Sequence, residues 1–355
     1  MTKYLSSVPR LSLPDRYLWD PWPVQHPDGS TLRLGEAEVW VALVSDASCH
    51  PDDRHDLPRQ HLLLLTDQLT DLGPLFPGGS TPGSREWSGS TIYEAERRII
   101  TAFYTAAGRH AEQQVTYEQR LFAAEGTVDL SHGFQVTSWG PHEELVAASP
   151  PYLPSGHTPG TPERWLHGFR DPGWFRDPIS GTDYLLVAAS VDSADGEGPW
   201  GAVALVQYEN DRWILQPPIL AATGWNRELE RPHIIWRDGR YYLFVSTQQH
   251  TFTPPHSGRT GLYGYVASAI DGPYAPVNGD GLVLANPPER PHHAYAWLVL
   301  DDLRVGAFLN YPDEPAGETR PGPHAAFAGG FAPFRRLRIN GDQISVEDER
   351  EAHTA

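Results

Sequence analysis

Three acidic residues stand in similar short frames, each close to proline and to arginine or tryptophan. The frames are "LWDPWPV" around Asp20, "HGFRDPGWF" around Asp171 and "RELERPHIIW" around Glu230. Proline fixes φ and lacks a backbone donor, so it holds a neighbouring residue in place. An adjacent arginine keeps a carboxylate ionised or orients it. Cleavage of a glycosidic bond needs two carboxylates, one to attack or activate water and one to protonate the leaving oxygen. A third carboxylate can hold sugar hydroxyls, so the pattern indicates a glycosidase-like site.

Each frame taken alone also has a purely structural explanation. The tripeptide "RDP" is common where strands begin, and its aspartate often caps a turn. Asp20 is the strongest single candidate because Trp19 and Trp22 flank it, and we expect these rings to shape a small dry pocket around it. Three such frames in one chain are a stronger signal than any one of them.

The elements that must position these residues are predicted to be strands. Short apolar runs of five to ten residues, rich in β-branched and aromatic residues, are bounded by Gly, Pro, Asp or Asn, as in β-proteins with frequent turns. In "WRDGRYYLFV", Asp238-Gly239 is the expected hairpin turn. Residues 90–105 have the best helical pattern, although their isoleucines and aromatics also fit a strand. We therefore predict an all-β chain, either a β-propeller or a large sandwich, in which no exact repeat reveals a blade number.

Segments rich in Pro, Gly and His interrupt the runs and are too short to be linkers between domains. They cover residues 72–83, 150–162, 194–199, 252–260 and 312–323. Loops on one face of a rigid scaffold commonly carry function. We expect one catalytic domain over residues 1–355, with a short lead (1–15) and tail (346–355).

The composition excludes several classes of protein. A net charge of −18 and a pI of about 5.2 disfavour nucleic acid or an anionic membrane as a partner. The single cysteine, Cys49, excludes an intramolecular disulfide and a multi-cysteine zinc site. The 16 histidines show no clear zinc spacing, so we expect no metal. Without a secretory h-region or an 18-residue apolar stretch, the expected location is the cytoplasm, or outside the cell if a signal peptide was removed.

The chain resembles glycoside hydrolase family 68, the levansucrases, inulosucrases and related β-fructofuranosidases. The resemblance is carried, in the family's order, by "WDPWP" (19–23), "EWSGS" (86–90), "FRDP" (169–172), "ELERP" (228–232) and "AYAWLV" (294–299), with an echo in "FAPFRRLRINGD" (331–342). The matches span about residues 17 to 345. Each motif alone is weak, but the ordered combination is specific.

The resemblance implies a five-bladed β-propeller with a funnel-shaped pocket, and a retaining double displacement on sucrose without a cofactor. It implies that Asp20 is the nucleophile, Glu230 the general acid/base and Asp171 the transition-state stabiliser. Sucrose and sugar acceptors are the implied partners. Further implied contacts are Trp19, Trp87, Ser88 and Arg170 for the fructosyl group, Glu228 and Arg231 for the glucosyl group, Tyr295 near the acid/base, and Gln248 for the acceptor.

Departures from the family and competing interpretations complete the prediction. Some relatives bind calcium with an acidic residue where this chain has Arg227, so that calcium staple is not expected. Arg231 follows Glu230, where invertase-like enzymes usually have cysteine, which disfavours that branch. The neutral Gln248, where levan-forming relatives commonly have Arg or His, favours short products over polymer. The alternatives are another five-bladed glycosidase, invertase-like or arabinan- or xylan-cleaving, and a sugar-binding propeller without catalysis.

Overall fold

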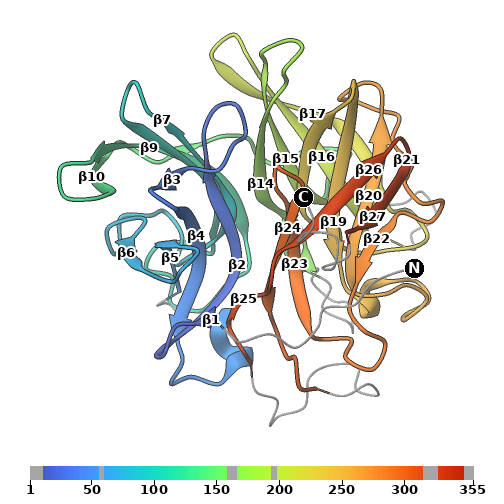
Figure 1. Ribbon diagram of the computed structural model, residues 1–355, viewed down its shortest axis with the longest axis horizontal. Helices are drawn as coiled ribbons and strands as arrows, with labels where there is room; N and C mark the ends of the chain where they lie inside the picture. Colours follow the sequence, from blue (N-terminus) through green and yellow to red (C-terminus); the bar gives the residue numbers. More distant parts are fainter. Residues whose placement is uncertain (1–10, 56–59, 158–165, 193–197, 315–326, 348–355) are drawn as a thin grey trace.

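The computed structural model describes residues 11–55, 60–157, 166–192, 198–314 and 327–347 and is a five-bladed β-propeller (Figure 1). Across this part of the chain, the only helical segments are two short 3-10 turns, η1 (Pro51–His55) and η2 (Gln249–Thr251). None of the described residues forms a helix that is long and apolar enough to span a membrane. The predicted all-β class is confirmed, and of the two predicted architectures the propeller is the one observed.

Each blade is an antiparallel sheet whose first main strand lies innermost. Blade one contains β2 (Arg16–Gln25), β3 (Arg33–Leu34), β4 (Ala37–Asp46), β5 (His61–Thr66) and β6 (Asp71–Pro74). Blade two contains β7 (Arg85–Glu94), β8 (Ile99–Ala107), β9 (Gln119–Asp129), β10 (Gln135–Trp139) and β11 (Glu143–Glu144). Blade three contains β14 (Phe169–Arg176), β15 (Asp183–Val191), β16 (Trp200–Glu209) and β17 (Arg212–Ala221), preceded by the small pair β12 (Gly156–His157) and β13 (Leu166–His167).

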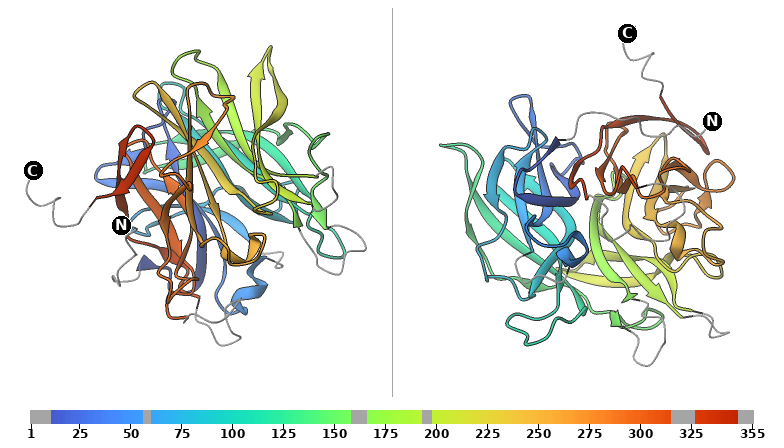
Figure 2. Two further views of the ribbon diagram at one scale, coloured as in Figure 1. Left: turned by 90° about the vertical axis from the view of Figure 1, so that its right-hand side faces the viewer. Right: turned by 90° about the horizontal axis from the view of Figure 1, so that it is seen from below.

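The last two blades complete the ring. Blade four contains β18 (Glu230–Arg237), β19 (Arg240–Thr247), β20 (Gly261–Ala267), β21 (Ala275–Pro276) and β22 (Leu282–Ala285). Blade five contains β23 (Ala294–Val299), β24 (Arg304–Leu309), β25 (Gly330–Phe331), β26 (Arg335–Asn340) and β27 (Gln343–Val346). The early strand β1 (Leu11–Ser12) pairs with β25, so a segment from the start of the chain closes the last blade (Figure 1). Seen from below, the blades follow one another round the ring in the order of the chain (Figure 2, right).

Packing between blades explains the long apolar runs. In β4, eight consecutive residues from Glu38 to Ser45 are buried, because neighbouring blades cover both faces of the strand and leave no solvent-facing side. Such strands lack the alternation of apolar and polar residues that marks a half-exposed sheet. The largest core cluster combines residues of blades one, two, four and five, and it holds the innermost strands rigidly around the axis.

The local predictions have clear outcomes. Residues 90–105 form the hairpin of β7 and β8, so their β-branched and aromatic residues outweigh their helical pattern. The turn between β18 and β19 is at Asp238 (φ 51°) and Gly239 (φ 76°), as expected for a type I′ hairpin. Parts of the predicted loops 150–162, 194–199 and 312–323, and of the lead and tail, lie outside the described residues.

Candidate active site

All five innermost strands carry a register shift at the same level. The shifts lie between Trp19 and Trp22, Trp87 and Gly89, Arg170 and Gly173, Glu230 and His233, and Tyr295 and Leu298. In four of them the residue after the first-named one has a positive φ: Asp20 (45°), Asp171 (58°), Arg231 (53°) and Ala296 (52°). Bulges re-aim side chains, and strained backbone of this kind clusters at functional sites. Nine of the residues implied by the family resemblance lie at these five shifts.

Asp171 is the most firmly held of the three candidate carboxylates. Its Oδ1 accepts a 2.6 Å hydrogen bond from the Ser88 hydroxyl, and its Oδ2 accepts a 3.3 Å bond from the Arg231 amide. Its own amide donates to Thr105 Oγ1 at 2.9 Å. The side chain is almost fully buried, and residues of blades two and four therefore fix its orientation.

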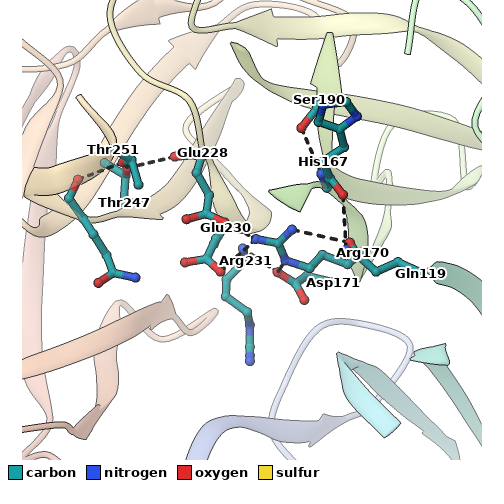
Figure 3. Close-up of polar contacts among 12 residues, drawn as sticks. Gln119, His167, Arg170, Asp171, Ser190, Glu228, Glu230, Arg231, Thr247 and Thr251 are labelled. Atoms are coloured by element: carbon teal, nitrogen blue, oxygen red, sulfur yellow. Dashed lines mark hydrogen bonds and ion pairs between the residues drawn. The ribbon is translucent and has the colours of Figure 1, made fainter. Parts of the chain in front are cut away.

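Arg170 joins two glutamates on the neighbouring blade (Figure 3). Its Nη2 donates to Glu230 Oε1 at 3.0 Å and also to Glu228 Oε1, and its Nε lies 3.8 Å from Asp171 Oδ2. One guanidinium therefore links three carboxylates from two blades. Because it is itself almost fully buried, its charge is poorly screened by water.

Glu230 has the environment of a proton donor. Tyr295 donates its hydroxyl to Glu230 Oε2, while Oε1 faces Arg170. Burial raises the pKa of Glu230 above its ordinary value, the nearby Glu228 raises it further, and Arg170 opposes both. A carboxyl group with a raised pKa stays protonated closer to neutral pH, as a general acid requires.

Asp20 is partly exposed, and the Arg231 guanidinium binds its backbone. Arg231 Nη1 donates to the Asp20 carbonyl at 2.8 Å and Nη2 donates to the Pro21 carbonyl at 3.2 Å. Burial raises the pKa of Asp20 to about 6, while Arg231 lowers it and Asp171 raises it. The structure thus brings Asp20, Asp171 and Glu230 into one polar network centred on two arginines.

Arg231, for which a contact with the glucosyl group was expected, has a buried side chain that binds backbone. Only 4% of its surface is exposed, and its guanidinium is engaged by the Asp20 and Pro21 carbonyls. The physical reason is that a bulge interrupts the sheet ladder and leaves carbonyls needing donors, which buried backbone rarely goes without. Trp22, which was expected to help shape a pocket around Asp20, packs against Arg231, whose guanidinium lies 5.4 Å from its ring centre, and its indole donates to Thr91 at 3.0 Å.

Trp19 and Trp87 share a neighbour that sequence reasoning missed. The His55 ring, at the end of η1, lies 5.6 Å from Trp19 and 6.4 Å from Trp87, nearly perpendicular to both. Burial lowers the pKa of His55 well below its ordinary value, which favours the neutral form of the ring. Arg54 lies 5.7 Å from the Trp19 ring. The clustering of His50, Arg54 and His55 was the only feature of the sequence that could have drawn attention to this segment. Nothing nearby in the sequence indicated that it packs against the two tryptophans.

Glu228 and Gln248 are connected through a hydroxyl network. Thr247 donates to the Glu228 carbonyl at 2.8 Å, and Thr251 donates to the Gln248 carbonyl at 2.8 Å. Asn226 links the two threonines through its side chain, with distances of 2.9 Å to each. The expected acceptor residue Gln248 therefore lies directly before η2, and this network connects its main chain to the loop that carries Glu228.

His233 and Arg227 both have partners within the fold. His233 accepts from the Val299 amide at 2.9 Å and bonds the Arg231 carbonyl at 2.9 Å, and burial lowers its pKa to about 4. Arg227 lies 4.9 Å from the Trp200 ring centre. Among the residues the structure describes, no three His, Cys, Asp or Glu side chains are grouped to hold a metal ion.

Comparison with known proteins gives a consistent result. The family model described as levansucrase/invertase matches residues 3–205 and 196–353. A levansucrase of Pseudomonas savastanoi pv. glycinea is 27% identical over 94% of this chain and 83% of its own, and an extracellular sucrase of Zymomonas mobilis is 29% identical over 93% and 84%. The structure of an inulosucrase from Halalkalicoccus jeotgali bound to kestose superposes with a TM-score of 0.87 at 32% identity, over 97% of this chain and 91% of that one.

Proposed function

The chain belongs to glycoside hydrolase family 68, the levansucrase and invertase family, and from this premise we propose that it cleaves sucrose and transfers the fructosyl group to water or to sugar acceptors. The observation that carries the proposal is the joining of Asp20, Asp171 and Glu230 by Arg170 and Arg231. Sucrose cleavage is consistent with relatives named levansucrase, sucrase and inulosucrase.

The first step forms a covalent intermediate. An Asp20 carboxylate oxygen attacks the anomeric carbon of the fructosyl group, and the bond from that carbon to the glucosyl oxygen breaks. Glu230 gives its proton to this oxygen, so glucose leaves as a neutral sugar. Because its pKa is raised, the Glu230 carboxyl group still holds the proton that this step needs. Asp171 accepts hydrogen bonds from fructosyl hydroxyls as the sugar ring gains positive charge.

The second step reverses the roles. The Glu230 carboxylate takes a proton from water or from an acceptor hydroxyl, whose oxygen attacks the anomeric carbon and releases Asp20. Water gives fructose, and a sugar acceptor gives a longer saccharide. Both displacements invert the anomeric carbon, so the configuration is retained.

The direct test measures glucose and fructose released from sucrose by the wild-type protein and by Asp20→Ala. We expect glucose release only from the wild type. Wild-type protein that is folded and releases no glucose would overturn the proposed function, and full activity of Asp20→Ala would overturn the assignment of the nucleophile.

The neutral side chain of Gln248 favours short products. An uncharged amide forms weaker hydrogen bonds to an acceptor than a cationic side chain, so a growing chain is retained less well. We expect hydrolysis and short transfer products from concentrated sucrose, and a shift to longer products in Gln248→Arg, both measured by chromatography. Abundant polymer from the wild type, or an unchanged product range in the variant, contradicts this role for Gln248.

A further inference from the structure

Arg231 touches the frames of all three candidate catalytic carboxylates. It follows Glu230 in the chain, and its amide donates to Asp171 Oδ2 at 3.3 Å. Its guanidinium donates to the carbonyls of Asp20 at 2.8 Å and Pro21 at 3.2 Å. Only 4% of the residue is exposed. One buried side chain therefore connects the bulge of blade four with the bulge of blade one.

A guanidinium suits this position for geometric reasons. Its planar fork presents two donors at a fixed angle, which matches two successive carbonyls at the interrupted ladder of β2. Its face lies 5.4 Å from the centre of the Trp22 ring, and the indole of Trp22 is itself held by Thr91. A lysine would keep the charge but could not reproduce the paired, stacked arrangement.

The charge has an effect on the nucleophile. Burial raises the pKa of Asp20 to about 6, and Arg231 is the strongest group that opposes this shift. Asp171 acts in the opposite direction, while Arg54 and Arg170 assist Arg231 less strongly. The positive charge therefore keeps Asp20 ionised over a wider pH range than burial alone would allow.

We propose that Arg231 is a positioning residue for the nucleophile. It fixes the bulge that carries Asp20 and places a positive charge beside the backbone of that residue. It makes no contact with the glucosyl leaving group. This inference rests on the proposed function, because it assigns a role within that reaction. In this role Arg231 affects the reaction through Asp20 and not through a contact with the substrate.

The leaving group provides the sharpest test. Arg231→Met and Arg231→Lys are assayed on sucrose, whose leaving group is glucose, and on inulobiose, whose leaving group is fructose. We expect Arg231→Met to lower kcat/KM by about 10²–10³-fold, by the same factor for both substrates, and Arg231→Lys to lose less. A loss confined to sucrose would show a glucosyl contact and overturn the inference.

The pH profile separates positioning from general structural damage. Without the charge of Arg231, Asp20 should ionise at higher pH, so the ascending limb of kcat/KM moves to higher pH in Arg231→Met and stays in place in Arg231→Lys. Should the methionine variant fail to fold, the lysine variant carries the test: a lowered kcat with an unmoved limb supports the inference, and wild-type kcat refutes it.

Arg231 borders a cavity of about 190 Å³ on the propeller axis, which offers a matched control and a rescue. Arg176 borders the same cavity but pairs with Asp183 at 2.8 Å, so Arg176→Met should keep wild-type kcat, KM and pH limbs.

Guanidinium ion added to Arg231→Ala should restore part of kcat for both substrates. Rescue of the sucrose reaction alone contradicts the inference. Wild-type protein inactive on both substrates would instead refute the proposed function.

Discussion

The bulges at Asp20 in blade one and at Asp171 in blade three have the same backbone form but different partners. Each places an aspartate at positive φ directly before a proline. The carbonyls of the first bulge accept from the charged guanidinium of Arg231. In the third-blade bulge, Ser90 donates to the Pro172 carbonyl at 2.7 Å and Thr105 accepts from the Asp171 amide at 2.9 Å.

The difference teaches how one backbone device yields two kinds of carboxylate. The nucleophile role proposed for Asp20 requires an ionised carboxylate that can reach the substrate, which suits a partly exposed side chain whose backbone binds the Arg231 guanidinium. A carboxylate that holds hydroxyls needs a fixed orientation, which the hydroxyl of Ser88 and the amide of Arg231 give to Asp171. The bulged strand sets where each aspartate lies, and the neighbouring side chains determine how exposed and how firmly held its carboxylate is.

Removing each charge in turn should give the largest effects and distinguish the two bulges. Asp20→Asn should lower kcat by about 10⁴-fold or more, because no fructosyl-enzyme can form. Asp171→Asn should lower kcat by about 10²–10⁴-fold while still forming that intermediate. Mass spectrometry of protein quenched during turnover checks this. A covalent adduct in Asp20→Asn, or none in Asp171→Asn at any time, would break the contrast.

The pH dependence of kcat/KM should be bell-shaped. Activity requires ionised Asp20, whose pKa is about 6, so the rate rises as pH increases through this value. Activity also requires protonated Glu230, whose pKa is raised by burial and by Glu228, so the rate falls when that proton is lost at higher pH. Because the pKa values of both carboxyl groups are raised, the expected optimum lies near neutral pH. A profile still level at pH 4.5 contradicts the assignment of Asp20.

Loss of an uncharged hydrogen-bond partner of Asp171 should have a moderate effect on the free energy of unfolding. Thr105→Val keeps the shape of the side chain but leaves the buried Asp171 amide without its acceptor, which costs about 1–3 kcal/mol of unfolding free energy. Thr101→Val, four residues earlier on β8, is the matched control and should cost less. Urea unfolding compares the two. Equal stabilities would show that the third-blade bulge does not depend on its hydroxyl partner.

The smallest effect should come from the fifth-blade bulge, where Ala296 has φ 52°. Glycine avoids a penalty of about 1–2 kcal/mol for this conformation, which offsets its greater loss of chain entropy of about 0.5–1 kcal/mol. Ala296→Gly should therefore leave the free energy of unfolding unchanged or raise it slightly, whereas Ala294→Gly on the same strand should lower it. Equal losses in calorimetry would indicate that positive φ carries no strain here.

The sequence revealed the frames of the site because their signals are local. Proline beside Asp20 and Asp171, and the hairpin turn at Asp238, act within a few residues, and so do the apolar runs of the strands. The guanidinium of Arg231 instead binds a carbonyl 211 positions away. Its direction depends on which backbone groups a bulge leaves unpaired, and a single sequence does not show this.

The five blades were implied by the family resemblance but could not be counted from a repeat in the residues, for a related reason. The five blades share a register shift at one level, yet the residues there are Asp20, Ser88, Asp171, Arg231 and Ala296. The repeat is therefore one of backbone form and not of residue type. Divergence at these positions is what allows each blade to contribute a different group to the same pocket.

The pairing of β1 with β25 has a consequence for how the protein is made. Leu11 and Phe331 are partners, although about 320 residues separate them. On the ribosome, blade one emerges first but cannot reach its final neighbour until nearly the whole chain has been synthesised. Contacts this distant in sequence slow folding. Asp20, the proposed nucleophile, follows β1 closely and therefore reaches its final surroundings late in biogenesis, so a chain that lacks the last blade should be inactive.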